Sequence, residues 1–435
     1  MSTKAEGEIL MKIPENVQCV IDAIHVHGNR CWLVGGAVRD SLLGKQPRDY
    51  DLLTDMSLEQ LKGVFSKVVV KGGLRQESAI VIFHGYPVDI VCLDDRDLYA
   101  EMARRDFTIN SLAIDLTDGK LLDYFNGQND LQRGILSCGT QIEEKINTDP
   151  IRIMRAVRFV CELDLAVDEK TNKVLKKNMH LLPLAAPERI RDEFVRMLMG
   201  TQLIKALRMM QHLGILAEVF PEIDAMCGCL QSPPHRGDVF EHTMSALEYA
   251  KADLELRLAV LLHDIGKPPT MSIEKGAYRF YGHHEVGAQM AVAMLRRLRF
   301  PGSIIRNVAT LIENHMFTYH SDTASKDLSR LYRDIGGHLI GKLVDVRICD
   351  WRSIFPEGDP ALFEQWRVRM CQIAKCFEAG TMQPAINGND IMRIAGVPPG
   401  AEVGVILEKV LAAIEESPTM NQKDKLEEFV RSITT

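Results

Sequence analysis

The sequence predicts an α+β chain in which a small mixed sheet with helices comes first and an all-α part follows. Three β-rich runs (KVVVKG, AIVIFHG and PVDIVCL) lie between Cys31 and about Phe125 and alternate with helical stretches. After about Asp149 the strand signals end, and segments such as DPIRIMRAVRFVCEL and PERIRDEFVRMLMG have helical periodicity. A chain of 435 residues is also too long for one compact core, so about two to four domains are expected.

The individual elements follow in order along the chain. Residues up to about His27 are typical of a tail and one helix, with Pro14 placed for the first helical turn. In the sheet region, the runs VVV and IVIF followed by glycine turns indicate hairpin strands rather than long βαβ crossovers. In the helical part, Gly200 and Gly214 suit helix ends, and the loop CGCLQSPPHRG at 227–237 marks a boundary.

Composition and charge narrow the classes of function. Hydrophobic residues make up 46% of the chain and charged residues 26%, as in ordinary soluble globular proteins. The net charge of −7 argues against a broadly basic nucleic-acid binder, although arginines cluster at 104–105, 152–158, 189–196 and 296–306 and allow a local basic groove. The ten cysteines have no framework spacing, and no apolar run approaches the ~20 residues that cross a bilayer. We expect a cytoplasmic protein with no membrane partner.

Two acids stand two residues apart in RDYDLLT. On a strand, Asp49 and Asp51 would point to the same face while Tyr50 points to the other. Two convergent carboxylates repel each other unless a cation lies between them, and hard oxygen ligands suit Mg²⁺ or Mn²⁺. Asp89, in another β-rich run, would supply a third carboxylate from a neighbouring strand.

A glycine pair precedes these acids in LVGGAVRD. Gly35 and Gly36 would let backbone N–H groups approach a ligand closely, and the helix that opens after them favours an anion. Arg39 lies where it would reach that anion. A lone DxD or GG is most often a surface or turn feature, so the functional interpretation depends on the two occurring together.

In this order and spacing, the stretch resembles the nucleotidyltransferase superfamily that includes DNA polymerase beta. It is more closely similar to the class II tRNA nucleotidyltransferases (CCA-adding enzymes) and bacterial poly(A) polymerases. The likeness rests on LVGGAVRDSLLG…RDYDLLT, on RRDFTINSLAID and on DPIRIMRAVRF, in the expected order, and YFNGQNDL and PERIRDEFVRML also fit. It covers roughly residues 30–225, and it implies a polymerase-beta-like nucleotidyltransferase head with a small mixed sheet, followed by an all-α neck.

The resemblance implies roles for individual residues. Asp49 and Asp51 would bind Mg²⁺, activate the primer 3′-hydroxyl and stabilise charge on the α-phosphate, with Asp89 as a further catalytic carboxylate. Arg105 and Asp106 would contact the phosphates and the ribose hydroxyls. The nucleotide-binding set so implied in the head is Gly35, Gly36, Arg39, Arg105, Asp106 and Asn110.

The block DPIRIMRAVRF resembles the family's protein template, in which side chains imitate base pairing. Asp149 would accept from an amino group of the incoming base, and Arg152 would donate to its other edge. The spacing of three from Asp149 to Arg152 to Arg155 keeps these groups on one face of a helix. Arg155 and Arg158 would then reach phosphates or hold the base-reading pair. Without the other blocks, the same arginines would indicate a solvated helix face.

Two departures from the family pattern bear on specificity. Thr148 stands where the family usually has Glu, next to the base-reading Asp149. The connection IVCLDDRDLYAEMA between Asp89 and Arg104 is shorter than the flexible loop with which full CCA-adding members switch from CTP to ATP. The short connection resembles the CC-adding subgroup, while a poly(A) polymerase is an alternative that lacks its expected basic tail.

The helical half carries a second set of chemistry-bearing residues. An adjacent His–Asp pair in LLHDIGKP is costly to bury without partners, and further His and Asp would complete a mono- or dinuclear metal centre. The set resembles the HD superfamily of metal-dependent phosphohydrolases. The ligands so implied are His242, His263, Asp264 and Asp350, with His284 and His315 as candidates for a second metal. Mn²⁺, Ni²⁺ and Fe²⁺ are the candidate ions, and phosphomonoesters or 2′,3′-cyclic phosphates are the candidate substrates.

Two hypotheses from different classes of reaction result. The first is an RNA nucleotidyltransferase that adds CTP, with or without ATP, to the tRNA 3′ acceptor end, with no DNA substrate and an open oligomeric state. The second is an HD phosphohydrolase whose first domain is a nucleotide-binding regulatory module. The expected domains are a tail and helix (1–28), the nucleotidyltransferase head (29–148), a helical neck (149–226), the HD domain (227–355) and a helical tail (356–435).

Overall fold

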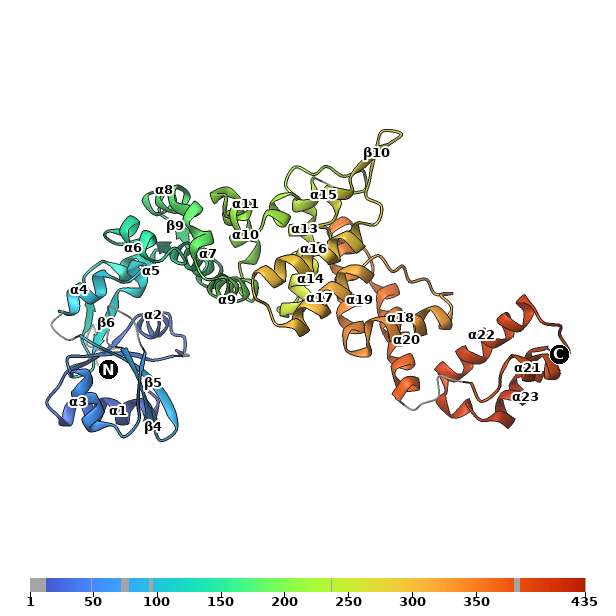
Figure 1. Ribbon diagram of the computed structural model, residues 1–435, viewed down its shortest axis with the longest axis horizontal. Coiled ribbons are helices and arrows are strands. Elements are labelled where there is room, and N and C mark those ends of the chain that lie inside the picture. Colours follow the sequence, from blue (N-terminus) through green and yellow to red (C-terminus); the bar gives the residue numbers. More distant parts are fainter. Residues whose placement is uncertain are drawn as a thin grey trace, which may run out of the picture. The chain divides into compact units, whose positions relative to one another are not determined.

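The computed structural model describes residues 13–434 except 48, 72–77, 94–96, 236 and 379–383. The chain forms two compact units, Met1–Glu218 and Val219–Thr435, and each is described by itself. The mixed α/β first unit and the helical second unit agree with the predicted fold class (Figure 1). The finer division into five domains stays a prediction.

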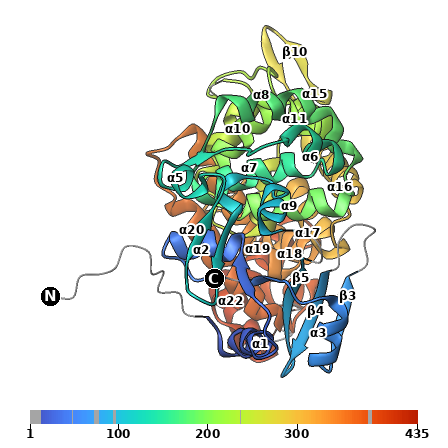
Figure 2. The ribbon, with the colours of Figure 1, turned by 90° about the vertical axis from the view of Figure 1, so that its left-hand side faces the viewer.

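A seven-stranded mixed sheet forms the centre of the first unit, with the strand order β3-β4-β5-β2-β1-β6-β7. The pairing of β2 with β5 is parallel, and the other pairs are antiparallel. Strands β3, β4 and β5 lie side by side in Figure 2, as their sequence runs predict. The strands are β1 Cys31–Val34, β2 Asp51–Thr54, β3 Val68–Lys71, β4 Ser78–Phe83, β5 Tyr86–Cys92, β6 Leu112–Asp115 and β7 Leu121–Asp123.

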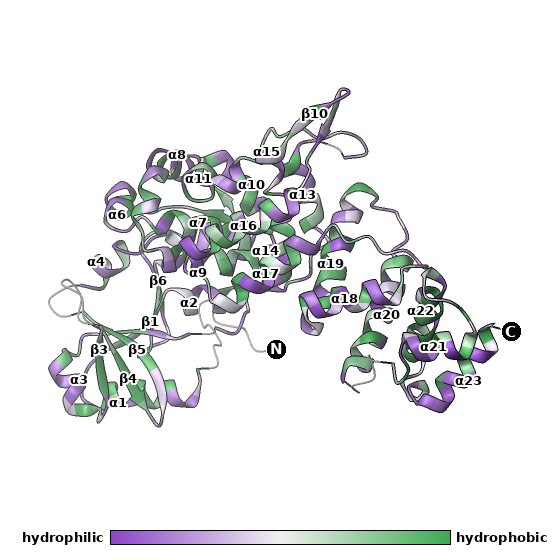
Figure 3. Ribbon diagram, turned by 45° about the vertical axis from the view of Figure 1, so that its right-hand side comes forward, coloured by the Kyte–Doolittle hydropathy of each residue, from purple (hydrophilic) through white to green (hydrophobic). Residues whose placement is uncertain are grey.

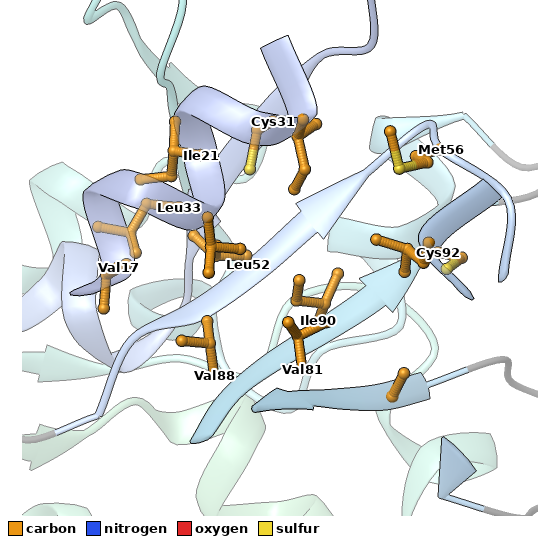
Figure 4. Packing of buried hydrophobic residues seen from close by; sticks show 14 of the residues in the cluster. Val17, Ile21, Cys31, Leu33, Leu52, Met56, Val81, Val88, Ile90 and Cys92 are labelled. Atoms are coloured by element: carbon orange, nitrogen blue, oxygen red, sulfur yellow. The ribbon is translucent and has the colours of Figure 1, made fainter. Parts of the chain in front are cut away.

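Helices cover both faces of this sheet, which explains why β1 is apolar at all four positions. Cys31 and Leu33 point to one core with helix α1, whereas Trp32 and Val34 belong to a second cluster with helix α4. Figure 4 shows the first core, where Val17 and other α1 side chains face the strands. The helices of this unit are α1 Glu15–Val26, α2 Gly36–Leu42, α3 Leu58–Val64, α4 Leu98–Ala103, η1 Thr108–Asn110, α5 Gly127–Gln132, α6 Ile142–Thr148, α7 Arg152–Leu163, α8 Glu169–Asn178, η2 Met179–Leu184, α9 Pro187–Leu198, α10 Leu203–Leu213 and α11 Ile215–Val219.

Among the described residues after Asp149, where only helices were expected, three short strands occur, and one of them pairs with a short strand of the head. Strand β8 (Ile135–Leu136) pairs with β9 (Ala166–Val167), and β10 (Ser272–Glu274) forms a hairpin with β11 (Ala277–Arg279). The hairpin turn has two residues, Lys275 and Gly276, with φ of 51° and 79°. A two-residue turn of this kind matches the twist of paired strands, but strands of two or three residues are too short to show a period of two in the sequence.

The second unit is otherwise built from helices. Its last part, from Cys376 to Val430, has an apolar core of its own. In Figure 3 the strands β3 to β5 of the first unit are mostly green, whereas helix α23 of the second unit alternates between polar and apolar residues. The helices are α12 Pro221–Asp224, α13 Val239–Leu247, α14 Leu254–Leu262, α15 Lys267–Thr270, α16 His283–Arg297, α17 Gly302–Asn314, α18 Ser325–Ile335, α19 Gly337–Ile354, α20 Ala361–Glu378, α21 Gly388–Ala395, α22 Ala401–Glu416, η3 Pro418–Met420 and α23 Lys423–Thr434. Among the described residues, no helix combines the length and the apolar character needed to span a membrane.

Gly127 offers a test of the packing that holds α5 against η1. A Cβ at this position would lie 2.2 Å from the Thr108 carbonyl oxygen, so Gly127→Ala is expected to lower the free energy of unfolding by about 1–3 kcal/mol. Urea denaturation followed by circular dichroism would measure the change. The matched control is Gly63→Ala in helix α3, where a Cβ meets nothing within 4 Å and a gain of about 0.5–1 kcal/mol is expected. Equal midpoints for the two variants would contradict the packing argument.

Candidate functional site

A cavity of about 890 Å³ lies within the first unit and is lined by helix α7 along its length and by the C-terminal end of α9. Its wall is mostly polar and includes eleven of the residues that the sequence singled out. These are Gly36, Arg39, Asp49, Asp51, Arg105, Asp106, Asn110, Asp149, Arg152, Arg155 and Arg158. Gly35 and Asp89, which were also singled out, do not line the cavity.

The two acids of RDYD lie at the N-terminal end of the central strand β2, and both are exposed. Asp51 is the first residue of β2 and stands opposite Asp89 in the parallel pairing with β5. The prediction that Asp49 also lies on this strand is wrong, because the β1–β2 pairing ends at Val34 and Asp51. The chain turns at Gly35 directly after Val34, so β1 has no residue left to pair with Asp49.

Gly35 is needed for a contact within the protein. Its φ is 69°, and a Cβ there would lie 2.3 Å from Nη1 of Arg105. The guanidinium of Arg105 therefore packs on the Gly35 backbone, between the sheet and the cavity. Burial lowers the pKa of Arg105, and the carboxylates of Asp51, Glu101 and Asp106 offset this only in part. Its Nε is buried and has no hydrogen-bond partner.

A buried hydrogen-bond network crosses the floor of the cavity. Nη1 of Arg39 donates to Oδ1 of Asn110 at 2.7 Å, and Nδ2 of Asn110 donates to Asp106 at 2.9 Å. Nε of Arg155 donates to the other carboxylate oxygen of Asp106 at 2.6 Å. Burial alone would raise the pKa of Asp106, but Arg155 and Asn110 outweigh it and the pKa lies below its usual value. Arg39 and Arg155 also contact the Phe159 ring, at 5.1 and 5.7 Å from its centroid.

The base-reading candidates come from the start of α7. The prediction that Asp149 shares a helix face with Arg152 is wrong, because α7 begins at Arg152 and Asp149 ends the preceding helix α6. Asp149 is instead held by Arg189 of α9, whose two Nη atoms donate to its two oxygens at 2.7 and 3.0 Å. Nε of Arg152 is buried and has no hydrogen-bond partner.

Arg158 points into the protein. Its Nη1 donates to Glu162 at 2.6 Å, its Nε donates to Glu193, and its side chain is 2% exposed. It also lies 4.0 Å from the centroid of Phe159. Of the two roles expected for Arg158, this geometry favours holding its neighbours over reaching a phosphate.

Sequence reasoning missed Arg189, Glu193 and Phe159 as parts of this site. Arg189 was noted only within the arginine cluster at 189–196, and both residues belong to PERIRDEF, where their spacing of four places them on one face of α9. That spacing shows that they face the same way, but it does not identify the residues of α7 that they meet.

The second unit brings together a separate group of histidines and aspartates, all from different elements except His263 and Asp264. The group, which we call the HD cluster, consists of His242 on α13, His263 and Asp264 directly after α14, His283 on α16, His315 directly after α17, and Asp350 on α19. Nε2 of His242 lies 3.4 Å from Asp264 and 3.1 Å from Asp350. Nε2 of His263 and Nε2 of His283 lie 3.1 and 3.4 Å from Asp264.

The orientation of the four imidazoles suits a metal ion. Each ring uses Nδ1 for a hydrogen bond to the surrounding protein, which directs Nε2 inward. The Nδ1 partners are the carbonyls of Val260, Phe280 and Ile312 for His263, His283 and His315, at 2.7, 2.9 and 2.6 Å, and the Ser353 hydroxyl for His242, at 2.9 Å. The donor set is therefore imidazole nitrogen and carboxylate oxygen, which first-row transition metals accept.

Asp264 lies between two possible metal positions. It forms one group with His242 and His263 and another with His283 and His315, and the ligand atoms within each group lie within 4.8 Å of one another. Burial would raise the pKa of Asp264, but His263 and Lys267 hold it well below its usual value. The carboxylate is thus anionic and suited to bridge two cations.

The structure corrects one assignment in this group. His284 was expected to be a ligand, but its side chain is 31% exposed and its Nε2 lies 3.9 Å from Glu285. Its neighbour His283 enters the cluster instead. Consecutive residues on a helix point about 100° apart, so only one histidine of the pair can face inward, and the packing of α16 decides which.

Comparison with known proteins agrees with this architecture. Residues 31–93 and 91–137 match the family model of the poly A polymerase head domain, and residues 239–336 match that of the HD domain. Residues 164–227 match the model described as the probable RNA and SrmB-binding site of polymerase A.

Curated relatives and solved structures extend the match to most of the chain. An A-adding tRNA nucleotidyltransferase of Deinococcus radiodurans is 32% identical, over 88% of this chain and 90% of its own length. A CC-adding tRNA nucleotidyltransferase of Thermus thermophilus is 30% identical, over 88% of this chain and 89% of its own length. A CCA-adding enzyme of Bacillus stearothermophilus with CTP has the same fold, with a TM-score of 0.65 at 22% identity over 97% and 98% of the two chains. The chain therefore belongs to the family of class II tRNA nucleotidyltransferases and bacterial poly(A) polymerases, and it carries an HD domain.

Proposed function

We propose that the chain transfers nucleotides from CTP to the 3′ end of tRNA. The observation that carries this proposal is the cavity of the first unit, where Asp49 and Asp51 share a wall with Arg105, Arg152 and Arg155. Its volume of about 890 Å³ is in the range of small-molecule sites. Carboxylates suit divalent ions, and guanidinium groups suit a triphosphate.

The residues of this cavity match the steps of nucleotidyl transfer. The 3′-oxygen of the primer bonds to the α-phosphorus, and the bond from that phosphorus to the pyrophosphate leaving group breaks. Mg²⁺ held by Asp49 and Asp51 would lower the pKa of the hydroxyl and offset the developing negative charge. Arg105 and Arg155 would orient the triphosphate and stabilise the leaving pyrophosphate. Asp106 holds the guanidinium of Arg155, and that of Arg105 packs on Gly35, so these two groups need little reorganisation during the reaction.

Base selection would depend on Asp149 and Arg152. The Asp149 carboxylate is held at both oxygens by Arg189, so it offers acceptors in one fixed direction. An acceptor beside a guanidinium complements the amino group and ring nitrogen of cytosine. A rigid arrangement favours one base, because a second base would need the same two groups to move.

The connection after β5 supports CC addition as the nucleotide specificity. Strand β5 ends at Cys92 and helix α4 begins at Leu98, so only residues 93–97 lie between them, of which 94–96 are outside the described part of the chain. So short a connection leaves no long loop to rearrange the base-reading groups between CTP and ATP. The relatives include A-adding, CC-adding and CCA-adding proteins, so their names leave this specificity open.

For the second unit we propose a metal-dependent phosphohydrolase that acts on phosphomonoesters or 2′,3′-cyclic phosphates. Four imidazoles that direct Nε2 toward Asp264 and Asp350 carry this proposal. A bound Mn²⁺, Ni²⁺ or Fe²⁺ would supply a hydroxide at neutral pH. The oxygen of water would bond to phosphorus, the bond from phosphorus to the ester oxygen would break, and the proton of the water would go to the leaving alcohol. In the alternative, hydrolysis is the only activity and the first unit is a regulatory module. That alternative predicts that Asp51→Ala leaves the main activity intact.

A primer-extension assay with Mg²⁺ tests the transfer activity and its specificity. Three tRNA transcripts ending at the discriminator base, in C and in CC would each receive CTP, ATP or both. We expect two cytidines on the first transcript, one on the second and no adenosine on any. Asp49→Ala and Asp51→Ala are expected to lower the rate at least about 1,000-fold, because the charge developing at the α-phosphate loses its counter-ions. Completion to CCA would overturn CC specificity, long adenosine tails would indicate a poly(A) polymerase, and unchanged extension by Asp51→Ala would overturn the proposed site.

Arg189→Met tests whether the orientation of Asp149 sets base selection. Without the two hydrogen bonds from Arg189 the carboxylate can rotate, so kcat/KM for CTP is expected to fall about 10- to 100-fold and the preference for CTP over UTP to weaken. Steady-state kinetics with each nucleotide would measure both effects. Arg191→Met on the same helix is the control, because Arg191 pairs with its neighbour Asp192 and does not line the cavity. Equal losses in the two variants would contradict the role of Arg189.

The neighbouring histidines His283 and His284 provide a matched test of the metal centre. His283→Ala is expected to weaken metal binding at least about 10-fold, whereas His284→Ala leaves it unchanged, because only His283 faces Asp264. Metal per chain would be measured by mass spectrometry after dialysis, with nucleotide addition assayed alongside as a check that the first unit is intact. Loss of metal in His284→Ala alone would reverse the assignment.

A further inference from the structure

Several buried polar atoms around the HD cluster have no hydrogen-bond partner. They are Nε2 of Gln231, Nδ1 of His235 and Nε of Arg347. Such atoms occur elsewhere among the described residues, as at Arg105 and Arg152 of the nucleotide cavity, and they usually indicate a water, an ion or a ligand. The three nitrogen atoms need an acceptor. None of them is explained by the metal ligands themselves.

The orientation of the Gln231 amide follows from its neighbour Lys267. Nζ of Lys267 lies 2.6 Å from Oε1 of Gln231 and 2.7 Å from Oδ2 of Asp264. An ammonium group can only donate, so the amide oxygen must face Lys267 and the amide NH₂ must face away from it. Gln231 is only 9% exposed, so this NH₂ has little water available to it. A second donor thus lies directly beside Lys267 and the metal cluster.

The loop that carries Gln231 contacts the elements around the cluster at several of its described residues. Its ends are joined by a β-bridge between Leu230 and Asp238, and Asp238 also caps α13, the helix that carries His242. Within the loop, the Ser232 hydroxyl accepts a hydrogen bond from the Tyr278 N–H of strand β11 at 2.7 Å. The His235 ring meets the ring of the metal ligand His242 edge-on, with centroids 4.8 Å apart.

Charge balance at the site favours an anionic ligand. The carboxylate of Asp264 is paired with Lys267, and that of Asp350 is paired with Nη1 of Arg347 at 2.7 Å. The two acids are therefore already neutralised by two cations before any metal binds. Each divalent ion then adds two positive charges, so an oxyanion is attracted and the nearby carboxylates do not repel it strongly.

We propose that Gln231, His235 and Lys267 form a cradle for the non-bridging oxygens of a phosphomonoester at the HD cluster. This inference rests on the proposed phosphohydrolase activity and names its substrate class. Three groups each donate to a phosphoryl oxygen: Nε2 of Gln231, Nζ of Lys267, and Nδ1 of His235 in the tautomer that carries its proton on Nδ1. A terminal phosphate has three such oxygens and carries up to two charges, whereas a 2′,3′-cyclic phosphate has two and carries one. The cradle therefore prefers a terminal phosphate, such as the one on a damaged RNA 3′ end.

Gln231→Glu and Gln231→Met separate this role from a purely structural one. Glutamate keeps the acceptor for Lys267 but replaces the donor NH₂ with an oxygen, whereas methionine removes both. Inorganic phosphate would be titrated into the Mn²⁺-loaded full chain by calorimetry, with the bound metal quantified in each sample. We expect both variants to bind phosphate at least about 10-fold more weakly than the wild type at unchanged metal content. Gln289→Glu is the control, an exposed glutamine on α16, and is expected to change phosphate affinity less than about twofold.

The outcomes distinguish the cradle from the activity on which it rests. If Gln231→Met binds phosphate more weakly and Gln231→Glu binds it with wild-type affinity, the glutamine acts only by holding Lys267 and the cradle is overturned. If both variants bind phosphate as the wild type does, the unpartnered atoms bind only water and the cradle is again overturned. Hydrolysis of 4-nitrophenyl phosphate and of 2′,3′-cyclic AMP would be compared in the same samples. A higher kcat/KM for the cyclic substrate would overturn the substrate class, while phosphate binding that depends on Gln231 without any hydrolysis would support an anion site and overturn the phosphohydrolase.

Discussion

The buried carboxylate of Asp106 is the constraint on which the nucleotide cavity depends. It accepts hydrogen bonds from Asn110 and Arg155, and Asn110 in turn binds Arg39. Helix α2, the turn η1 and helix α7 therefore meet at one anion. A charge removed from water is stable only while its partners stay in place, so these segments cannot separate without a large cost. As a result, the arginines of the cavity are already positioned before a nucleotide arrives, which is the condition for effective electrostatic catalysis.

The HD cluster uses the same strategy with different groups. Backbone carbonyls hold Nδ1 of His263, His283 and His315, so the direction of each ring is set by the helix end that carries it. Asp264 lies between the rings and is balanced by Lys267. In both sites the reactive groups are oriented by hydrogen bonds and ion pairs with neighbouring groups of the protein. The difference lies in the charge: the first cavity offers several cations to a triphosphate, while the second is close to neutral until a metal binds.

The two proposed activities fit one substrate. A tRNA whose 3′ oxygen carries a phosphate has no free 3′-hydroxyl and cannot act as a primer for nucleotide addition. A phosphohydrolase on the same chain would restore that hydroxyl and so supply the substrate of the transfer reaction. This relation gives a chemical reason for one chain to carry both sites.

The sequence by itself determined the fold class and the residue types of both sites, because these depend on local patterns. The runs KVVVKG, AIVIFHG and PVDIVCL predicted β3, β4 and β5, and helical periodicity predicted α7, α9 and α10. The order of three motif blocks identified the family. The placement of Asp89 on a strand next to Asp51 was also expected, and the parallel pairing of β2 with β5 puts the two residues opposite each other.

Only the tertiary structure decided how these residues meet. It selected His283 over His284, placed Asp149 one turn before α7 rather than on it, and directed Arg158 into the protein. It also supplied Arg189 as the partner of Asp149. The physical reason is the same in each case. Spacing along a sequence tells which side chains of one helix or strand face the same way, but which partner they face depends on the packing of elements that are distant in the chain.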